Sequence, residues 1–166
     1  MNVLRKLLQK VLGVGPGQED DTGPIAHPQY ERAQMDAALK EHVVPCLRAM
    51  GFKGSLPHFY RERAGAIDVL TFQFNRYGGK FVVEMARLPS EGIAVHGAHI
   101  PPSKMRSYHG SQRHRLGSDL RSNWGDHWFA FAHREPSLVA KEVCAELDKS
   151  ELWRFIDTLD QEAGDP

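Results

Sequence analysis

The chain has 166 residues, of which 41% are hydrophobic and 25% charged, and its formal net charge at pH 7 is +0. These values are ordinary for a soluble globular protein, and the balanced charge argues against a protein that coats nucleic acid by bulk charge. No run approaches the roughly 18 apolar residues of a membrane span, and Arg5, Lys6 and Lys10 interrupt the apolar core that a signal peptide needs. We therefore expect a cytoplasmic protein with one domain and an appendage.

The appendage comprises residues 1–29. Residues 3–12 repeat apolar side chains at helical spacing, with basic residues on the opposite face, and predict a short amphipathic helix. Residues 13–29 are rich in Gly, Pro and acidic residues and predict a linker, so the domain proper comprises residues 30–166. A helix this short is marginal alone in water. Its expected docking sites are its own domain, a second copy in a homo-oligomer, a partner groove or an anionic membrane surface, and the remaining alternative is a frayed leader.

The domain begins with a helix predicted over residues 30–50, where apolar side chains form one stripe. Pro45 lies inside this pattern and is expected to kink or restart the helix, because it cannot donate a backbone hydrogen bond. Gly51 fits the left-handed residue that closes a helix, with Phe52 folding back over the last turn.

Alternating apolar residues then predict three strands, over residues 57–63, 67–76 and 80–88, joined by short turns. The apolar faces of the last two are formed by Leu70, Phe72 and Phe74 and by Phe81, Val83 and Met85. A fourth strand is predicted over 92–99 and a fifth over 127–133, with a mostly irregular segment between them. Short connections favour antiparallel neighbours, and helices must cover one face of the sheet.

Two further helices follow these strands. Pro136 occupies the favoured first turn of one helix, and Ser150 is expected to cap the other. The elements together predict an α+β fold, with an antiparallel four- or five-stranded sheet flanked by helices and a separate N-terminal amphipathic helix. Cys46 and Cys144 fall in apolar helical patterns and are expected to be reduced core residues.

Several short motifs resemble one known family. They are GFK at 51–53, FYR at 59–61, LTFQF at 70–74, GGKFVVEM at 78–85, RLG at 115–117 and DHWF at 126–129. Across residues 33–155 the chain resembles the domain-of-unknown-function family numbered 4304. The resemblance implies a bacterial α+β domain with a central antiparallel sheet flanked by helices, and it implies no activity. The chain departs from the family pattern at Glu84, where a neutral polar residue is more usual, and at Phe129, where a second Trp often follows Trp128.

Histidines are numerous in one region of the chain. Five of the nine fall within residues 96–127, and His96 and His99 form an HxxH pair. Together with His109 and His114 they are candidate metal ligands, since zinc accepts imidazoles from many backbone paths. On a strand, however, residues three apart point to opposite faces, and no HExxH or CxxC motif accompanies these histidines. We expect histidines of a polar loop, with no metal and no cofactor.

A basic loop is the second polar cluster. Residues 104–121 carry five basic residues against the single acid Asp119, with Tyr and His interleaved. Such a loop can bind phosphate, an RNA strand or an acidic protein. It can equally pair with residues 142–166, which hold eight acidic and two basic residues, or remain solvated. No helix-turn-helix, RNP or zinc-finger signature favours nucleic acid.

The block at residues 115–128 adds two tryptophans. Arg115 and Asp126 can form a bidentate ion pair, with Trp124 and Trp128 packed over the sheet edge. This arrangement pins a long loop to the core, or it forms a recognition surface, since Trp and Arg are typical interface anchors. The candidate partner-binding residues are therefore Arg106, Tyr108, Arg113, Arg115, Trp124, Asp126 and Trp128.

The chain carries no catalytic signature, since it lacks a GxSxG nucleophile elbow and its GVGPG segment lacks the ending of a phosphate loop. Glu62 and Glu84 are a candidate carboxylate pair, but Arg61, Arg63 and Arg87 nearby make solvated salt bridges the better explanation. We expect a non-enzymatic module of the immunity or adaptor type, whose basic, Trp-bearing face holds an acidic protein. The alternative is a His-rich metal-dependent enzyme or a nucleic-acid-binding protein, and membrane contact is expected only through the N-terminal helix.

Overall fold

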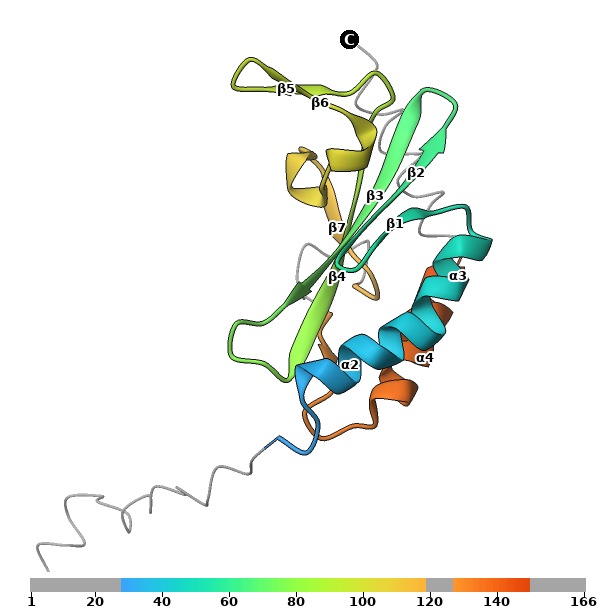
Figure 1. Ribbon diagram of the computed structural model, residues 1–166, viewed down its shortest axis with the longest axis vertical. Helices are drawn as coiled ribbons and strands as arrows, with labels where there is room; N and C mark the ends of the chain where they lie inside the picture. Colours follow the sequence, from blue (N-terminus) through green and yellow to red (C-terminus); the bar gives the residue numbers. More distant parts are fainter. Residues whose placement is uncertain (1–27, 119–126, 150–166) are drawn as a thin grey trace, which may run out of the picture.

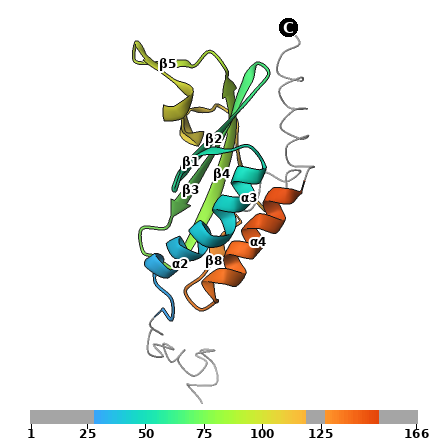
Figure 2. The same ribbon diagram turned by 45° about the vertical axis from the view of Figure 1, so that its right-hand side comes forward.

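The computed structural model describes residues 28–118 and 127–149. The helix predicted over 3–12, the linker up to residue 27 and the helix predicted from Ser150 lie outside the described residues. Figure 1 shows the described part as a twisted sheet with helices along one side, and Figure 2 shows the same helices packed against that face. The α+β fold, with an antiparallel sheet flanked by helices, is confirmed.

Over the described residues, the main sheet has six strands in the order β1-β2-β3-β4-β7, with β8 also paired to β4, and every pairing is antiparallel. The strands are β1 (Lys53–Ser55), β2 (His58–Arg63), β3 (Ala66–Phe74), β4 (Lys80–Pro89), β7 (Arg113–Arg115) and β8 (Phe129–Ala130). The long strands β2, β3 and β4 agree closely with the predicted ranges. β1 and β7 are not predicted by the sequence pattern, because each has only three residues.

The prediction of a single fourth strand over 92–99 is wrong. The chain forms a separate hairpin there, with β5 (Ile93–Val95) antiparallel to β6 (Ala98–Ile100). His96 and Gly97 make its two-residue turn with φ of 49° and 80°, and positive φ at both central residues is what this tight turn requires. The fifth predicted strand, 127–133, is confirmed as the two-residue β8.

The first predicted helix consists of three joined segments, α2 (Arg32–Ala38), the π-helical η1 (Leu39–Val43) and α3 (Val44–Ala49). Pro45 lies in the first turn of α3, so the helix restarts there. Because Pro45 has no N–H to donate, the wider π turn just before it accommodates the missing bond. Gly51 ends the helix at φ 84°, and the N–H of Phe52 donates to the carbonyl of Leu47 at 2.9 Å.

The described part of the chain ends with the helix α4 (Pro136–Asp148), which starts at the predicted proline and packs against η1 and α2. Two short 3-10 turns, η2 (Pro102–Lys104) and η3 (Ser107–His109), precede β7. Among these described helices, none has the length and apolar character that a membrane crossing requires.

Two apolar clusters of described residues pack on the two faces of the sheet. The larger one lies under the helices, on the face predicted for β3 and β4, and contains a group of phenylalanine rings in mutual contact: Phe59, Phe72, Phe74, Phe81, Phe129 and Phe131. The smaller one lies on the other face, where Met105 packs with Ile67, Val69, Ala86 and Leu88. Polar side chains of the same face, among them Thr71, Gln73 and Glu84, form the candidate site.

Candidate functional site

The polar part of the second sheet face is centred on a buried carboxylate. Glu84 of β4 is 5% exposed, and its Oε1 accepts hydrogen bonds from Ser107 Oγ at 2.9 Å and from Gln73 Nε2 at 3.1 Å. Arg113 Nη1 lies 3.6 Å from the same oxygen. A buried carboxylate needs such donors, because desolvation otherwise penalises its charge heavily. Glu84 therefore ties η3 and β7 to β4.

Thr71 extends this network toward the turn between β1 and β2. Its Oγ1 accepts the backbone N–H of Ser107 at 3.3 Å and lies 3.3 Å from Nδ1 of His58. His58 is half-buried, and its pKa is lowered first by burial and then by the charge of Arg106. The imidazole is therefore neutral at neutral pH.

Serine, histidine and glutamate come close together here, but their contacts do not match a nucleophilic set. Ser107 is fully buried and its hydroxyl proton points to Glu84, while His58 contacts Thr71. A nucleophile must be reachable by its substrate and bonded to its base. The network therefore holds the η3 loop on the sheet, and these residues assemble no acyl-transfer site.

Beside this network lies a more exposed group of side chains, the basic sheet face, which comprises Lys80, Arg113, Arg115 and Trp128. Trp128 is half-buried, with Lys80 Nζ 4.5 Å and the Arg115 guanidinium carbon 5.9 Å from its ring centroid. Cations within about 6 Å of an aromatic face are attracted to it. Arg113, whose side chain is 49% exposed, lies on the same strand as Arg115. Three predicted partner-binding residues thus come together, and the pairing of β4 with β8 adds Lys80, which sequence reasoning missed.

Two other predicted residues, Arg106 and Tyr108, lie on the segment formed by η2 and η3. Arg106 Nη1 donates to the carbonyl oxygens of Ser103 at 3.2 Å and Met105 at 2.7 Å, and Tyr108 is an exposed side chain. Arg106 influences His58 of β2, whereas the basic sheet face is built on β4, β7 and β8, so the predicted residues form two groups.

The remaining predicted partner-binding residues, Trp124 and Asp126, lie outside the described residues. The ion pair between Arg115 and Asp126 therefore stays a prediction. The packing of Trp124 over the sheet edge likewise stays a prediction. Trp128 directly precedes β8, and Lys80 Nζ lies 4.5 Å from its ring centroid.

The candidate metal ligands are distributed over several elements. His96 lies in the hairpin turn and His99 on β6, while His109 Nδ1 accepts the backbone N–H of Arg106 at 3.1 Å. His114 lies on β7, opposite Met85. Within residues 28–118 and 127–149, no three His, Cys, Asp or Glu side chains are grouped so that they could hold a metal ion.

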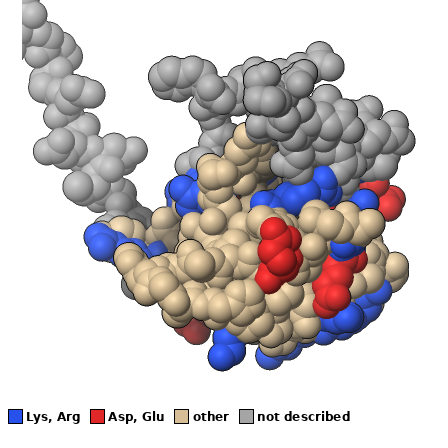
Figure 3. All heavy atoms as spheres, turned by 90° about the horizontal axis from the view of Figure 1, so that it is seen from above, with Lys and Arg blue, Asp and Glu red and all other residues tan. Residues whose placement is uncertain are grey.

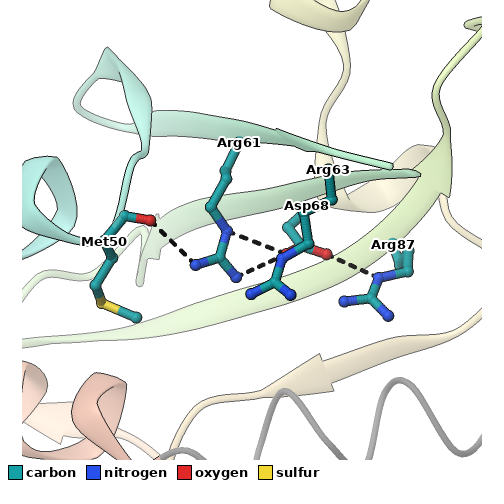
Figure 4. Close-up of polar contacts among 5 residues, drawn as sticks. All are labelled: Met50, Arg61, Arg63, Asp68 and Arg87. Atoms are coloured by element: carbon teal, nitrogen blue, oxygen red, sulfur yellow. Dashed lines mark hydrogen bonds and ion pairs between the residues drawn. The ribbon is translucent and has the colours of Figure 1, made fainter. Parts of the chain in front are cut away.

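An ionic cluster that sequence reasoning missed lies on the helix side of the sheet. Asp68 of β3 is fully buried, and its carboxylate accepts from Arg61 Nη2 at 2.7 Å, from Arg87 Nε at 2.8 Å and from Arg63 Nε at 3.0 Å, as Figure 4 shows. Arg61 Nη1 also donates to the carbonyl of Met50 at 3.1 Å. The cluster therefore ties β2, β3 and β4 to the end of α3.

This cluster corrects the prediction for the two glutamates. Glu62 forms an exposed pair with Lys53 at 3.6 Å, as predicted for a solvated salt bridge, but Glu84 is buried. The arginines expected beside them contact Asp68 instead. The sequence signal for this cluster was Asp68, a lone acidic residue in the apolar run of β3. In the strand register Asp68 stands directly opposite Arg61 and Arg87.

Cys46 and Cys144 are free thiols of intermediate exposure at the contact of α3 with α4. Both Sγ atoms donate to the carbonyl oxygen of His42, at 3.2 and 3.4 Å. Burial, together with the neighbouring Cys46, raises the pKa of Cys144 to about 12. The reactive form of a cysteine is its thiolate, so this environment disfavours nucleophilic chemistry at Cys144.

Charged side chains of both signs share the surface seen in Figure 3. Over the described residues in this view, basic and acidic groups are interspersed among uncharged residues. An extended basic field is the usual footprint of a protein that binds a nucleic-acid backbone. The mixed distribution of charged side chains in this view is typical of local, short-range ionic contacts.

Comparison with known proteins places the fold in a family. The model of the family described as "Domain of unknown function (DUF4304)" matches residues 43–157. This range contains all strands of both sheets, the polar network and the basic sheet face. No curated protein and no solved structure matches the chain. The resemblance carried by the short motifs is thus confirmed over most of the chain, which belongs to the DUF4304 family.

Proposed function

We propose that the protein is a non-enzymatic binding module of the immunity or adaptor type, and that its basic sheet face binds an acidic surface of a partner protein. The observation that carries this proposal is the half-exposed Trp128, whose ring centroid lies 4.5 Å from the Lys80 ammonium and 5.9 Å from the Arg115 guanidinium carbon. An aromatic ring flanked by cations offers apolar area and positive charge at one point, which is the composition of many interface anchors. The proposal assumes a cytoplasmic protein, as the sequence predicts, and a bacterial one, as the family resemblance implies.

The charge of the face favours an acidic partner. Three of the four residues of the basic sheet face, Lys80, Arg113 and Arg115, are cationic. The neighbouring Glu84 contacts Arg113, but its Oε1 already accepts hydrogen bonds from Ser107 and Gln73. An acidic surface complements this arrangement, because complementary charge speeds encounter and disfavours basic partners.

The small extent of the face favours a protein over a nucleic acid. A nucleic-acid backbone presents phosphates at regular spacing, and affinity grows with the number of phosphates that are neutralised. Trp128 and three cationic side chains offer a local contact instead. Such a contact matches a cluster of Asp or Glu side chains on a folded partner.

The test is capture of partners by the full-length protein and by a charge-reversal variant, K80E/R113E. Arg115 is left unchanged because it stands directly opposite the buried Glu84 in the register of β4 with β7. The matched control is K40E/K141E, since both lysines are exposed on helices, Lys40 on η1 and Lys141 on α4. Wild type and control are expected to retain the same acidic proteins from a nuclease-treated lysate, and the charge-reversal variant is expected to lose them.

Salt provides the second criterion, because exposed ionic contacts weaken as the Debye length shortens. Retention should therefore fall as salt rises. Capture of no protein above background, or equal retention by K80E/R113E, overturns the proposal. Proteins that are retained from an untreated lysate but lost after nuclease treatment support nucleic-acid binding instead.

A further inference from the structure

A small pocket lies at the other side of the polar sheet face, between the β1–β2 turn and the η2–η3 segment. It has a volume of about 170 Å³ and is lined by residues 54–60 together with Ser103 and Arg106. Gly54 shapes its wall, since its φ is 100° and a Cβ there would lie 2.6 Å from the carbonyl oxygen of His58. The pocket does not include any residue of the basic sheet face.

Arg106 supplies a fixed positive charge to this pocket. Its Nη1 donates to the carbonyl oxygens of Ser103 and Met105, so backbone contacts position the guanidinium. A guanidinium carries five N–H donors, and Nη1 accounts for two of them. Among the described residues, no carboxylate forms an ion pair with Arg106 and no acceptor contacts its Nε or Nη2.

His58 supplies a second donor in the same pocket. Thr71 Oγ1 already accepts the backbone N–H of Ser107, so its hydroxyl proton is available for Nδ1 of His58, 3.3 Å away. In that arrangement Nδ1 is the acceptor, and the proton of the neutral ring resides on Nε2. Burial and Arg106 keep the ring neutral by lowering its pKa. In that tautomer the ring presents an N–H donor at Nε2 rather than a second positive charge.

The polar side chains that line the pocket are mainly hydrogen-bond donors. The guanidinium and the imidazole N–H are donors, the hydroxyls of Ser55 and Ser103 can donate, and the lining contains no Asp or Glu. Donors that converge around a cation without a counter-ion are suited to an oxyanion, because charge-assisted hydrogen bonds are the strong ones.

The volume limits the size of the ligand. Pockets for organic ligands measure about 300–1,000 Å³, and the present one measures about 170 Å³. At roughly 30 Å³ per water molecule, it holds about five or six waters, which is room enough for one small ionic group. We propose that this pocket binds a single oxyanion group, a phosphate or a carboxylate, between Arg106 and His58.

The test is a titration of the full-length protein with inorganic phosphate, and separately with acetate, at constant ionic strength maintained with chloride. The probe is the imidazole resonance of His58, followed by NMR as a function of pH. A bound anion opposes the two effects that lower the pKa of this group. The expected result is a saturable shift, with the pKa of His58 rising by about one unit or more in the bound state.

Variants assign the effect to the pocket. R106Q should lose the saturable response, R106K should retain a weaker one, and K104Q, a charge change at an exposed neighbour that does not line the pocket, should retain the full response. The R106K variant guards against mere loosening of the loop, because it restores the charge while the bidentate geometry of Arg is absent.

Each outcome has a defined meaning. Saturation by phosphate alone, by acetate alone or by both supports the proposal and identifies the preferred oxyanion. A response that never saturates, or one that is equal in R106Q, overturns it. The result is independent of the capture experiment above, since the pocket and the basic sheet face share no residue.

Discussion

Replacement of Asp68 by Asn is the sharpest test of how this sheet is held together. The substitution keeps the shape of the side chain and removes its charge. Three guanidiniums then face a neutral amide, and the side chains of two of them, Arg61 and Arg87, are only 12% and 11% exposed. The expected result is a large loss of stability, because breaking a buried ion pair from one side leaves uncompensated buried charge.

The magnitude follows from the geometry. Removing one partner of a buried pair costs about 3–5 kcal/mol. The lower end applies here, since the Arg63 side chain is 43% exposed and Arg61 also donates to the carbonyl of Met50. We expect D68N to lower the free energy of unfolding by about 3 kcal/mol, which corresponds to a fall in Tm of roughly 6–12 °C for a domain of this size.

Urea denaturation of the full-length chain measures the effect, and E62Q is the matched control. Glu62 also pairs with a cation, Lys53 at 3.6 Å, but both side chains are more than half exposed, so its loss should cost less than about 1 kcal/mol. A D68L/R61L/R87M variant should recover most of the loss in D68N, because an apolar trio leaves no buried charge. If D68N costs no more than E62Q, the cluster does not stabilise the sheet and the reasoning fails.

Three further predictions follow from the core and the titrating groups. The pKa of His58 in the folded state is lowered from 6.5, so the unfolded state binds the proton more readily. The free energy of unfolding should therefore fall as the pH drops below about 6.5. In urea denaturation at a series of pH values, H58Q should show a smaller fall over this range. Cys144, with its pKa near 12, should react with iodoacetamide roughly 100- to 1,000-fold more slowly than an unperturbed thiol, and peptide mapping that finds rapid labelling would contradict the burial argument. Phe81 is fully buried among four other phenylalanine rings, so F81A should cost about 3–5 kcal/mol in urea denaturation and F81L less.

The fold was accessible from the sequence where the signal is local. Alternation in 67–76 and 80–88 identifies two strands and their buried faces, and Gly51 and Pro136 mark helix ends, because these depend on neighbouring residues alone. The segment 92–99 shows the limit of this approach. Its alternation fits one strand, but His96 adopts φ of 49° and turns the chain back on itself, and a non-glycine residue with positive φ gives little warning in the sequence.

The candidate site was less accessible, because it depends on register across the sheet. Arg113, Arg115 and Trp128 were named from composition, but Lys80 joins them only through the pairing of β4 with β8. Asp68 was missed since an acid in an apolar run is conspicuous only when its cross-strand neighbours are known to be Arg61 and Arg87. The same holds for His58, which meets Thr71 across β2 and β3.

The two sides of the sheet use charge differently, and the difference indicates where function lies. On the helix side, the buried Asp68 brings three arginines to one carboxylate, and each contact joins elements of the fold. On the other side, Glu84 is similarly shared, but Arg106 is held by backbone carbonyls without a carboxylate among the described residues. A cation that is positioned but not neutralised adds little to stability. Local rules that a sequence breaks without a gain in stability are expected at functional sites, so the pocket beside Arg106 and the basic sheet face are the places to test first.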